Sequence, residues 1–225
     1  MKKTQDKIFL ESEGNKWYKR NKMALKAGKS DIPMMLMELY DIEPTRVLEV
    51  GASNGYRLAE IYKKYGCEVY GLEPSKDAIE EGGNKYGFIK FQRNTAENME
   101  YKKQFFDLII LNSVFHWIDR ETLLMSIGNI DRTLQWGGYM IIGDFQVPFP
   151  IKRRYHHLQD MKVFTYKIDY KKILLATGIY KEIVTLSFNH DNRNFEGNTT
   201  IDNYFSVSLL RKEDMYIERK GDIIK

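Results

Sequence analysis

The 225-residue sequence contains a single cysteine, Cys67, so an internal disulfide and a metal site built from cysteines alone are both excluded. It also lacks any run of the ~20 apolar residues that a membrane-spanning helix requires. No apolar stretch follows the polar start at residues 1–7, as a secretory signal would require. These absences predict a cytoplasmic protein with no membrane partner.

A strong charge imbalance is absent as well, because the formal net charge is only +4. Basic residues are spread along the chain but are denser over residues 152–172. This segment is either a solvated face or a site for phosphate groups on a substrate. The chain has no internal repeat or low-complexity tract, and its apolar fraction of 43% suits a globular protein.

The most informative stretch is RVLEVGASNG, residues 46–55. It predicts a buried strand that runs into a tight glycine turn, followed by a helix. Gly51 and Gly55 allow the backbone to turn sharply and to lie against a ligand, because neither has a side chain. Glu73 ends the next strand about twenty residues later, where a carboxylate binds ribose in dinucleotide-type βαβ units. The pattern therefore predicts a site for a cofactor that contains adenosine.

The loop favours one class of such cofactors. A nicotinamide site has the pattern G-x-G-x-x-G, and this chain departs from it at Ser53 and Tyr56. Glu49, two residues before the first glycine, would repel a pyrophosphate but can help to hold a cationic amino-acid group. S-adenosylmethionine carries an ammonium group and a sulfonium but no phosphate, so it is the predicted cofactor.

The same stretch resembles motif I of the class I S-adenosylmethionine-dependent methyltransferases, E/D-x-G-x-G-x-G. Glu49, Gly51 and Gly55 match this motif, and Ser53 replaces its middle glycine. Three later stretches resemble further landmarks of the family in the correct order; they are GLEPS at 71–75, FDLIIL at 106–111 and QWGGYMII at 135–142. The resemblance covers roughly residues 40–145 and implies a small-molecule methyltransferase domain.

The alternation of apolar strands and amphipathic helices predicts an α/β fold. Five βα units are followed by two strands, at about 180–188 and 204–210, which gives a Rossmann-like, seven-stranded, mostly parallel sheet with helices on both faces. The resemblance implies that the last strand lies antiparallel beside the fifth.

We expect a single domain over residues 1–225. Residues 1–40 are expected to form a helical lid, with one helix from about 6 to 28. Residues 145–178 are expected to be an insertion on the substrate side, irregular or partly helical in its first part. The charged residues 211–225 are expected to be a disordered tail.

Ligands of open α/β sheets bind at the carboxyl ends of the strands, so the candidate cofactor residues lie there. The expected set is Glu49, Gly51, Ala52, Ser53, Gly55, Glu73, Pro74, Thr95, Ala96, Asn112 and Ser113.

Several of these residues have expected roles. Glu73 is expected to bind the ribose hydroxyls. The resemblance implies that the backbone of Thr95 and Ala96 contacts adenine. In the lid, either Tyr18 or Arg20 is expected to meet the cofactor carboxylate, unless the helix is simply an exposed amphipathic one.

His116 is the candidate catalytic residue. It lies just beyond the end of the fourth strand, and imidazole is suited to act as a base near neutral pH. The alternative is a purely structural or cofactor-facing role, with Asp144 or His157 as the base. The pair at 156–157 has no matching ligand cluster, so no metal site is expected.

The predicted function is methyl transfer from S-adenosylmethionine to a small molecule, such as a sugar, a nucleotide-linked sugar or another phosphorylated metabolite. In the insertion, the acceptor is expected to meet Arg153, Arg154, Tyr155 and His157.

Two alternatives stay open at this point. The basic segment 152–172 is compatible with a methyltransferase of tRNA or another nucleic acid. That partner is not favoured, because no nucleic-acid-binding module is visible. The chain is also compatible with a non-catalytic cofactor-binding partner of another methyltransferase.

Overall fold

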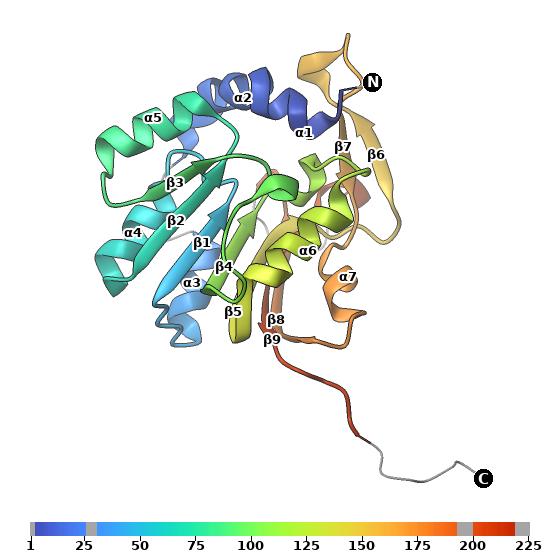
Figure 1. Ribbon diagram of the computed structural model, residues 1–225. Helices are drawn as coiled ribbons and strands as arrows, with labels where there is room; N and C mark the ends of the chain where they lie inside the picture. The colour runs from blue at the N-terminus through green and yellow to red at the C-terminus, as the bar shows by residue number, and fades with distance from the viewer. Residues whose placement is uncertain (1–2, 26–30, 193–199, 219–225) are drawn as a thin grey trace, which may run out of the picture.

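The computed structural model describes residues 3–25, 31–192 and 200–218. Its main sheet has the strand order β3-β2-β1-β4-β5-β9-β8 (Figure 1). The strands are β1 (Arg46–Val50), β2 (Glu68–Glu73), β3 (Lys90–Arg93), β4 (Phe106–Asn112), β5 (Leu134–Phe145), β8 (Tyr180–Asn189) and β9 (Tyr204–Lys212). The first five are parallel, and β9 lies antiparallel between β5 and β8. The predicted Rossmann-like sheet with an antiparallel last strand is confirmed.

Alternating side chains of the parallel strands build two hydrophobic clusters, one on each face of the sheet. Val47 belongs to the cluster covered by α3 (Ile32–Leu39) and α4 (Tyr56–Tyr65). The next residue, Leu48, belongs to the cluster covered by α6 (Leu123–Thr133) and α7 (Lys171–Leu175). Both residues are fully buried, as expected for a parallel strand with helices on both faces. The remaining helix, α5 (Lys76–Lys85), joins β2 to β3.

The amino-terminal region is not the single helix predicted from 6 to 28. It consists of α1 (Gln5–Ile8), a π-helix η1 (Phe9–Glu13), α2 (Gly14–Asn21) and a 3₁₀ turn η2 (Lys22–Ala24). The predicted end at Gly28 lies outside the described residues. Figure 1 shows α1 and α2 lying across one edge of the sheet. The π-helix shifts the helical phase, because it has more residues per turn than an α-helix.

The insertion after β5 is more regular than predicted. It contains a hairpin of β6 (Ile151–Arg154) and β7 (Phe164–Lys167), with a 3₁₀ turn η5 (His156–Leu158) between the two strands. The hairpin lies beside the amino-terminal helices (Figure 1), where Phe164 exchanges hydrogen bonds with the Gln5 side chain.

The expected disordered tail is partly ordered. Arg211 and Lys212 belong to β9, and the Met215 N–H donates to the Gly178 carbonyl at 2.9 Å. Residues 219–225 lie outside the described part of the chain. Among the described helices, none is long and apolar enough to cross a membrane.

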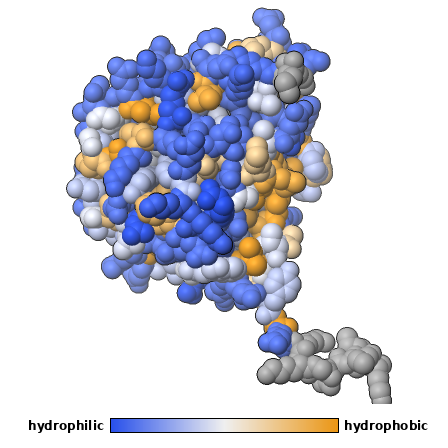
Figure 2. All heavy atoms as spheres, in the orientation of Figure 1, coloured by the Kyte–Doolittle hydropathy of each residue, from blue (hydrophilic) through white to orange (hydrophobic). Residues whose placement is uncertain are grey.

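The face seen in Figure 2 is largely hydrophilic, and apolar side chains gather on it over α6 and α7. Leu124 and Met125 of α6 are 73% and 53% exposed. The other apolar positions of α6, such as Ile127 and Ile130, face the sheet. Helix α6 therefore keeps the usual buried face of an amphipathic helix.

A buried ion triad ties β1, α3 and α4 together. The Arg57 Nε lies 3.0 Å from both carboxylate oxygens of Asp31, and its Nη1 donates to Glu49. Asp31 also caps α3, because it accepts a hydrogen bond from the Met34 N–H at 3.1 Å. All three side chains of the triad are nearly inaccessible to solvent. One guanidinium thus compensates two buried carboxylates.

We expect Arg57→Ala to lower the free energy of unfolding by about 3–5 kcal/mol, because it leaves two buried carboxylates without their cation. Urea denaturation measures this change. Lys63→Ala is the matched control, since Lys63 lies on the same helix in an exposed pair with Glu60 and should change stability little. Equal effects of the two substitutions would contradict a stabilising role of the triad.

Candidate functional site

A cavity lies at the carboxyl ends of the parallel strands, where ligands of this fold bind. It has about 790 Å³ of empty space, counted with the solvent at its mouth. Residues from five segments line it: Asp6, Phe9, Gly14, Trp17, Val50, Gly51, Leu72, Glu73, Pro74, Asn94, Thr95, Ala96, Asn112, Ser113, Val114, Trp117 and Ile118. The loops after β1, β2, β3 and β4 form its floor, and the amino-terminal helices form its outer wall.

The glycine loop after β1 requires Gly51 for two reasons. Its φ is +71°, and an added Cβ would lie 2.6 Å from the Cγ2 of Val114. Ser53, which stands in place of the middle glycine of motif I, also has a positive φ of 51°. This conformation is uncommon for residues other than glycine, which explains why the motif usually has glycine there.

Glu73 is the polar centre of the cavity floor. Its Oε2 accepts the Ser53 N–H and its Oε1 accepts the Ser75 N–H, both at 2.8 Å. These bonds fix the carboxylate between two loops and leave further lone pairs for a ligand. Burial raises the pKa of Glu73 to about 7.

Three buried oxygens around the glycine loop have no partner within the described structure: Glu49 Oε2, Ser53 Oγ and Asn54 Oδ1. Burial raises the pKa of Glu49 to about 7, although Arg57 opposes this shift. Unpaired buried acceptors are costly, and the predicted cofactor residues Glu49 and Ser53, like Asn54, are not among the residues that line the cavity. Gly55 and Ala52 do not line the cavity and instead pack below the loop.

The loop after β3 contributes Asn94, Thr95 and Ala96 to the cavity. The Asn94 side chain is used locally, because its Oδ1 accepts the Thr95 N–H at 2.9 Å and its Nδ2 donates to the Asn98 carbonyl at 2.7 Å. The loop therefore offers mainly backbone and the small side chain of Ala96. The contact of the Thr95 and Ala96 backbone with adenine stays a prediction.

Asn112 and Ser113 follow β4 and line the cavity as predicted. Ser113 has a φ of +64°, and its N–H donates to the Gly143 carbonyl at 2.7 Å. This bond holds the chain in a conformation that places Val114 over Gly51. The loop then turns into the 3₁₀ helix η4 (Phe115–Trp117).

His116 forms a buried dyad with Asp144. The imidazole Nδ1 lies 2.9 Å from the Asp144 Oδ1, and the His116 N–H donates to Oδ2 at 3.2 Å. The Phe145 N–H also donates to Oδ1, at 2.8 Å, so the carboxylate is well supplied with donors. A neutral imidazole that donates from Nδ1 can accept a proton at Nε2, as a general base does. His116 itself is buried and is not among the residues that line the cavity, unlike its neighbours Val114 and Trp117.

The outer wall comes from residues that the sequence did not identify as ligands. Asp6, Phe9, Gly14 and Trp17 line the cavity, whereas the expected Tyr18 and Arg20 do not. Their positions are separated by three, five and three residues, and the five-residue step crosses the π-helix Phe9–Glu13. The phase shift of that turn brings Trp17, and not its neighbours, to the cavity.

Tyr18 and Arg20 have other partners. The Tyr18 hydroxyl accepts a hydrogen bond from the Asn54 side chain at 3.3 Å. Arg20 donates to the buried carboxylate of Glu13 and, at 2.6 Å, to the Tyr155 hydroxyl. These contacts fasten the lid to the glycine loop on one side and to the insertion on the other.

The four residues expected to bind the acceptor do not line the cavity. Tyr155 is buried behind it, with its ring 4.7 Å from that of Trp117. Arg153 forms an ion pair with Asp202, while Arg154 and His157 are exposed. The insertion therefore acts on the cavity chiefly through Tyr155, which supports Trp117 from the rear. Among the described residues, no group of side chains is suited to hold a metal ion.

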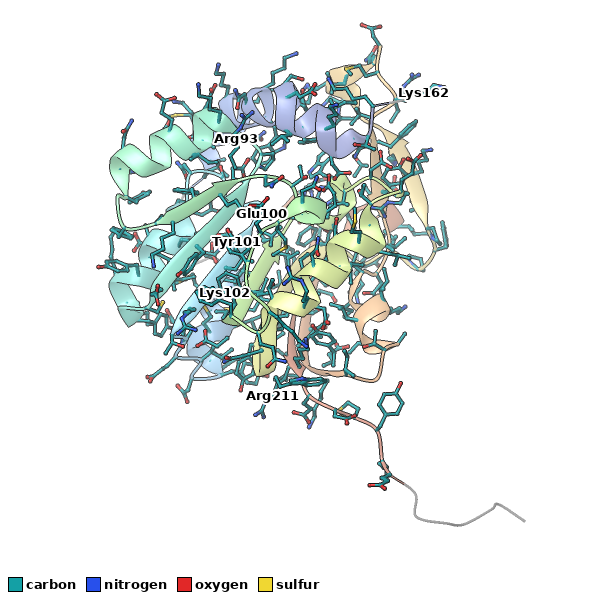
Figure 3. All side chains as sticks on the ribbon, in the orientation of Figure 1. Arg93, Glu100, Tyr101, Lys102, Lys162 and Arg211 are labelled. Carbon is teal, nitrogen blue, oxygen red and sulfur yellow. The ribbon has the colours of Figure 1, made fainter. Side chains whose placement is uncertain are left out.

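Arg93 completes the attachment of the lid. It lies at the end of β3, below the amino-terminal helices (Figure 3). Its Nη2 donates to the Leu10 carbonyl at 2.7 Å and its Nε to the Pro74 carbonyl at 3.2 Å. A single side chain thus joins the lid to the loop after β2.

Residues 48–142 match the family model described as a methyltransferase domain. The match runs from β1 to β5 and includes the glycine loop, Glu73 and the loop after β4. This match supports the class I S-adenosylmethionine-dependent methyltransferase family predicted from motif I.

One curated relative of this chain is the O-methyltransferase resE of Aspergillus sclerotiorum. The two are 27% identical over 144 residues, which make up 59% of this chain and 53% of the relative. The matched region therefore spans about half the length of that relative.

Solved structures show the same fold at low identity. The 1,6-didemethyltoxoflavin-N1-methyltransferase of Burkholderia thailandensis, crystallised with 1,6-didemethyltoxoflavin and S-adenosylhomocysteine, has a TM-score of 0.70 at 13% identity; the similarity covers 95% of this chain and 92% of that one. The [4+2]-cyclase SpnF has a TM-score of 0.69 at 12% identity, with coverage of 94% and 97%. Because the second protein is named as a cyclase, the reaction must be argued from the site and not from the fold.

We expect Glu73→Gln to weaken binding of S-adenosylhomocysteine, the product form of the family's cofactor, by about 1–3 kcal/mol. The affinity of the unchanged protein should rise from about pH 6 to about pH 8, because the ionised carboxylate accepts hydroxyl protons and the protonated form does so less well. The glutamine variant should show little of this rise. Calorimetry across this pH range measures both effects.

Glu68→Gln is the control, since Glu68 is an exposed carboxylate at the opposite end of the same strand. It should bind the ligand as the unchanged protein does. An unaltered dissociation constant in the Glu73 variant would remove this residue from the site.

Proposed function

We propose that this protein transfers the methyl group of S-adenosylmethionine to a small-molecule acceptor, with His116 as the general base. The observation that carries the proposal is the position of Glu73, whose carboxylate lies in the cavity and is held beside the glycine loop by the Ser53 N–H. Such a carboxylate binds the ribose hydroxyls of an adenosine-containing cofactor.

The remaining parts of the cofactor fit the same cavity. At the β1 end the cavity is lined by Val50 and Gly51, so the methionyl group would lie against the glycine loop. Leu72 and Pro74 flank the ribose position, and Ala96 offers a small surface to the base. The methyl group would then lie near Asn112 and Ser113. S-adenosylmethionine supplies the electrophilic methyl group, and the protein aligns the acceptor with it and excludes water.

The dyad His116–Asp144 favours an acceptor that must lose a proton, such as a hydroxyl or a ring N–H. Asp144 fixes the imidazole tautomer and stabilises the imidazolium that forms when the base takes the proton. An anionic carboxylate or phosphate acceptor would need no such base. The similar proteins described above as an O-methyltransferase and an N-methyltransferase act on atoms of this kind.

The walls of the cavity favour a flat acceptor. Phe9, Trp17 and Trp117 present three aromatic rings to it. Phe9 and Trp117 lie with their ring centroids 5.4 Å apart, and Tyr155 supports Trp117 from behind. Aromatic rings pack well on planar ligands. This supports a small aromatic or heteroaromatic acceptor more than the phosphorylated metabolite expected from the basic segment.

The basic segment gives little support to a nucleic-acid substrate, because several of its cations already have partners. Lys152 lies over the Phe164 ring, Arg153 pairs with Asp202, and Lys171 pairs with Glu182. RNA binding that falls steeply with salt would reverse this conclusion.

The alternative of a non-catalytic cofactor-binding partner is tested by turnover. An enzyme forms S-adenosylhomocysteine when the purified chain is incubated with S-adenosylmethionine and an acceptor, whereas a non-catalytic partner does not.

The cofactor assignment is tested directly by calorimetry with S-adenosylhomocysteine and with NAD. We expect binding of the first and none of the second, because Ser53 and Tyr56 break the pyrophosphate pattern and Glu49 repels phosphate. A preference for NAD would overturn the proposal.

The base is tested by His116→Ala, which should lower kcat roughly 10²–10⁴-fold while leaving the affinity for S-adenosylhomocysteine nearly unchanged. Asp144→Asn should lower kcat as well, and the double variant should be no worse than the more damaged single one, because the two residues act as a unit. Turnover of a panel of phenols and heteroaromatic N–H compounds measures the effect.

His156→Ala is the matched control, since His156 is exposed on η5 and takes no part in the His116–Asp144 dyad. It should retain full turnover. A small rate loss in the His116 variant would point to an acceptor that is already anionic.

A further inference from the structure

This inference rests on the proposed function, because the positions assigned there to the ribose and the methionyl group define the adenine end of the cavity. Glu73 marks the ribose, and the glycine loop beside Gly51 marks the methionyl group. The base must therefore extend in the opposite direction, toward the end of β3. There the cavity is lined by Thr95, Ala96 and Ile118, together with Asp6 of the lid.

Adenine carries a 6-amino group that donates hydrogen bonds. The segment after β3 contains the carboxylates of Glu97 and Glu100, but neither residue is among those that line the cavity. The Asn94 side chain is already bonded to the Thr95 N–H and the Asn98 carbonyl. The acceptor for the amino group must come from another segment.

Asp6 has the required geometry. Its Oδ2 accepts the Asp119 N–H at 3.1 Å and the Thr122 hydroxyl at 2.6 Å. Both bonds use the same oxygen, so Oδ1 keeps its lone pairs. The side chain is 95% buried and lines the cavity next to Ile118.

The neighbouring Gln5 holds Asp6 in position. Its side-chain amide donates to the Trp117 carbonyl at 2.6 Å and to the Phe164 carbonyl at 2.8 Å, and its oxygen accepts the Phe164 N–H at 2.9 Å. The Gln5 N–H also donates to Asp119 at 2.8 Å. The first turn of α1 is therefore fixed to both η4 and the hairpin.

The charges around Asp6 decide what kind of ligand edge can lie there. The charges of Glu97 and Asp119 oppose the ionisation of Asp6, whereas the hydrogen bonds from the Thr122 hydroxyl and the Asp119 N–H favour it. Burial raises the pKa of Asp6 to about 6, so at neutral pH it is mostly ionised. An acidic pocket of this kind repels a ligand oxygen and attracts a donor.

We propose that the Oδ1 of Asp6 accepts a hydrogen bond from the 6-amino group of adenine, so that the amino-terminal lid, and not the loop after β3, selects adenine over a 6-oxo base. Asp6 is then a specificity-determining residue for the cofactor. Because Asp6 belongs to the lid, the docked lid takes part in recognising the base. A site built around a hydrogen bond rejects an analogue that lacks the donor.

The test compares two ligands by calorimetry: S-adenosylhomocysteine and S-inosylhomocysteine, in which an oxygen replaces the 6-amino group. The unchanged protein should bind the adenine form at least about 10-fold more tightly. In Asp6→Ala the adenine form should weaken about 10-fold or more, while the inosine form weakens little, so most of the discrimination is lost.

Two variants distinguish the contribution of the Asp6 carboxylate to ligand affinity from the contribution of lid docking. Thr122→Val removes a partner of Asp6 but keeps its Oδ1, and should preserve most of the discrimination. Glu11→Gln removes an exposed acid of the same segment and should leave both affinities unchanged. Thermal unfolding with and without ligand confirms that each variant is folded.

An equal loss of affinity for both ligands in the Asp6→Ala variant would overturn the proposal, because it would show that Asp6 acts only by docking the lid. Equal affinity of the unchanged protein for the two ligands would overturn it as well. If the unchanged protein bound neither ligand, the proposed function itself would fail, and that outcome is distinct from the other two.

Discussion

The carboxylate of Glu73 is the constraint on which the rest of the cavity depends. By accepting one N–H from Ser53 and one from Ser75, it joins the loop after β1 to the loop after β2. Ser53 can meet it only in a conformation with positive φ, and Gly51 can approach Val114 only without a side chain. The strained glycine loop and the buried acid therefore stabilise one another. Each strand end contributes little alone, and together they form a floor that is complementary to an adenosine group.

Most of the fold and of the cavity floor could be predicted from the sequence, because these features depend on local signals. A buried strand, a glycine turn and a helix follow directly in residues 46–65, and the parallel arrangement then brings Gly51 and Glu73 to the same edge. The loop after β4 was located for the same reason. The exact start of α4 and the length of β5 depend on hydrogen bonds that a sequence pattern does not contain.

The outer wall could not be predicted, because its geometry depends on contacts between distant segments and on one irregular turn. Trp17 and Tyr18 are equally plausible cavity residues in an ideal helix, and only the π-helix before them selects Trp17. Arg153 looked like a substrate ligand because of its charge, but Asp202 lies opposite to it. The hairpin was not predicted, because the sequence between β6 and β7 contains no turn signal. Asp6 carries no motif at all, and only its position beside Ile118 makes it a candidate.

The attachment of Gln5 has a consequence for how the chain acquires its site. Its partners Trp117 and Phe164 lie 112 and 159 residues away, so Gln5 reaches its final place only after β7 has been made. Closing loops of this length is slow compared with forming local helices and neighbouring strands. A partly folded chain with its parallel sheet already assembled still lacks one side of the cavity.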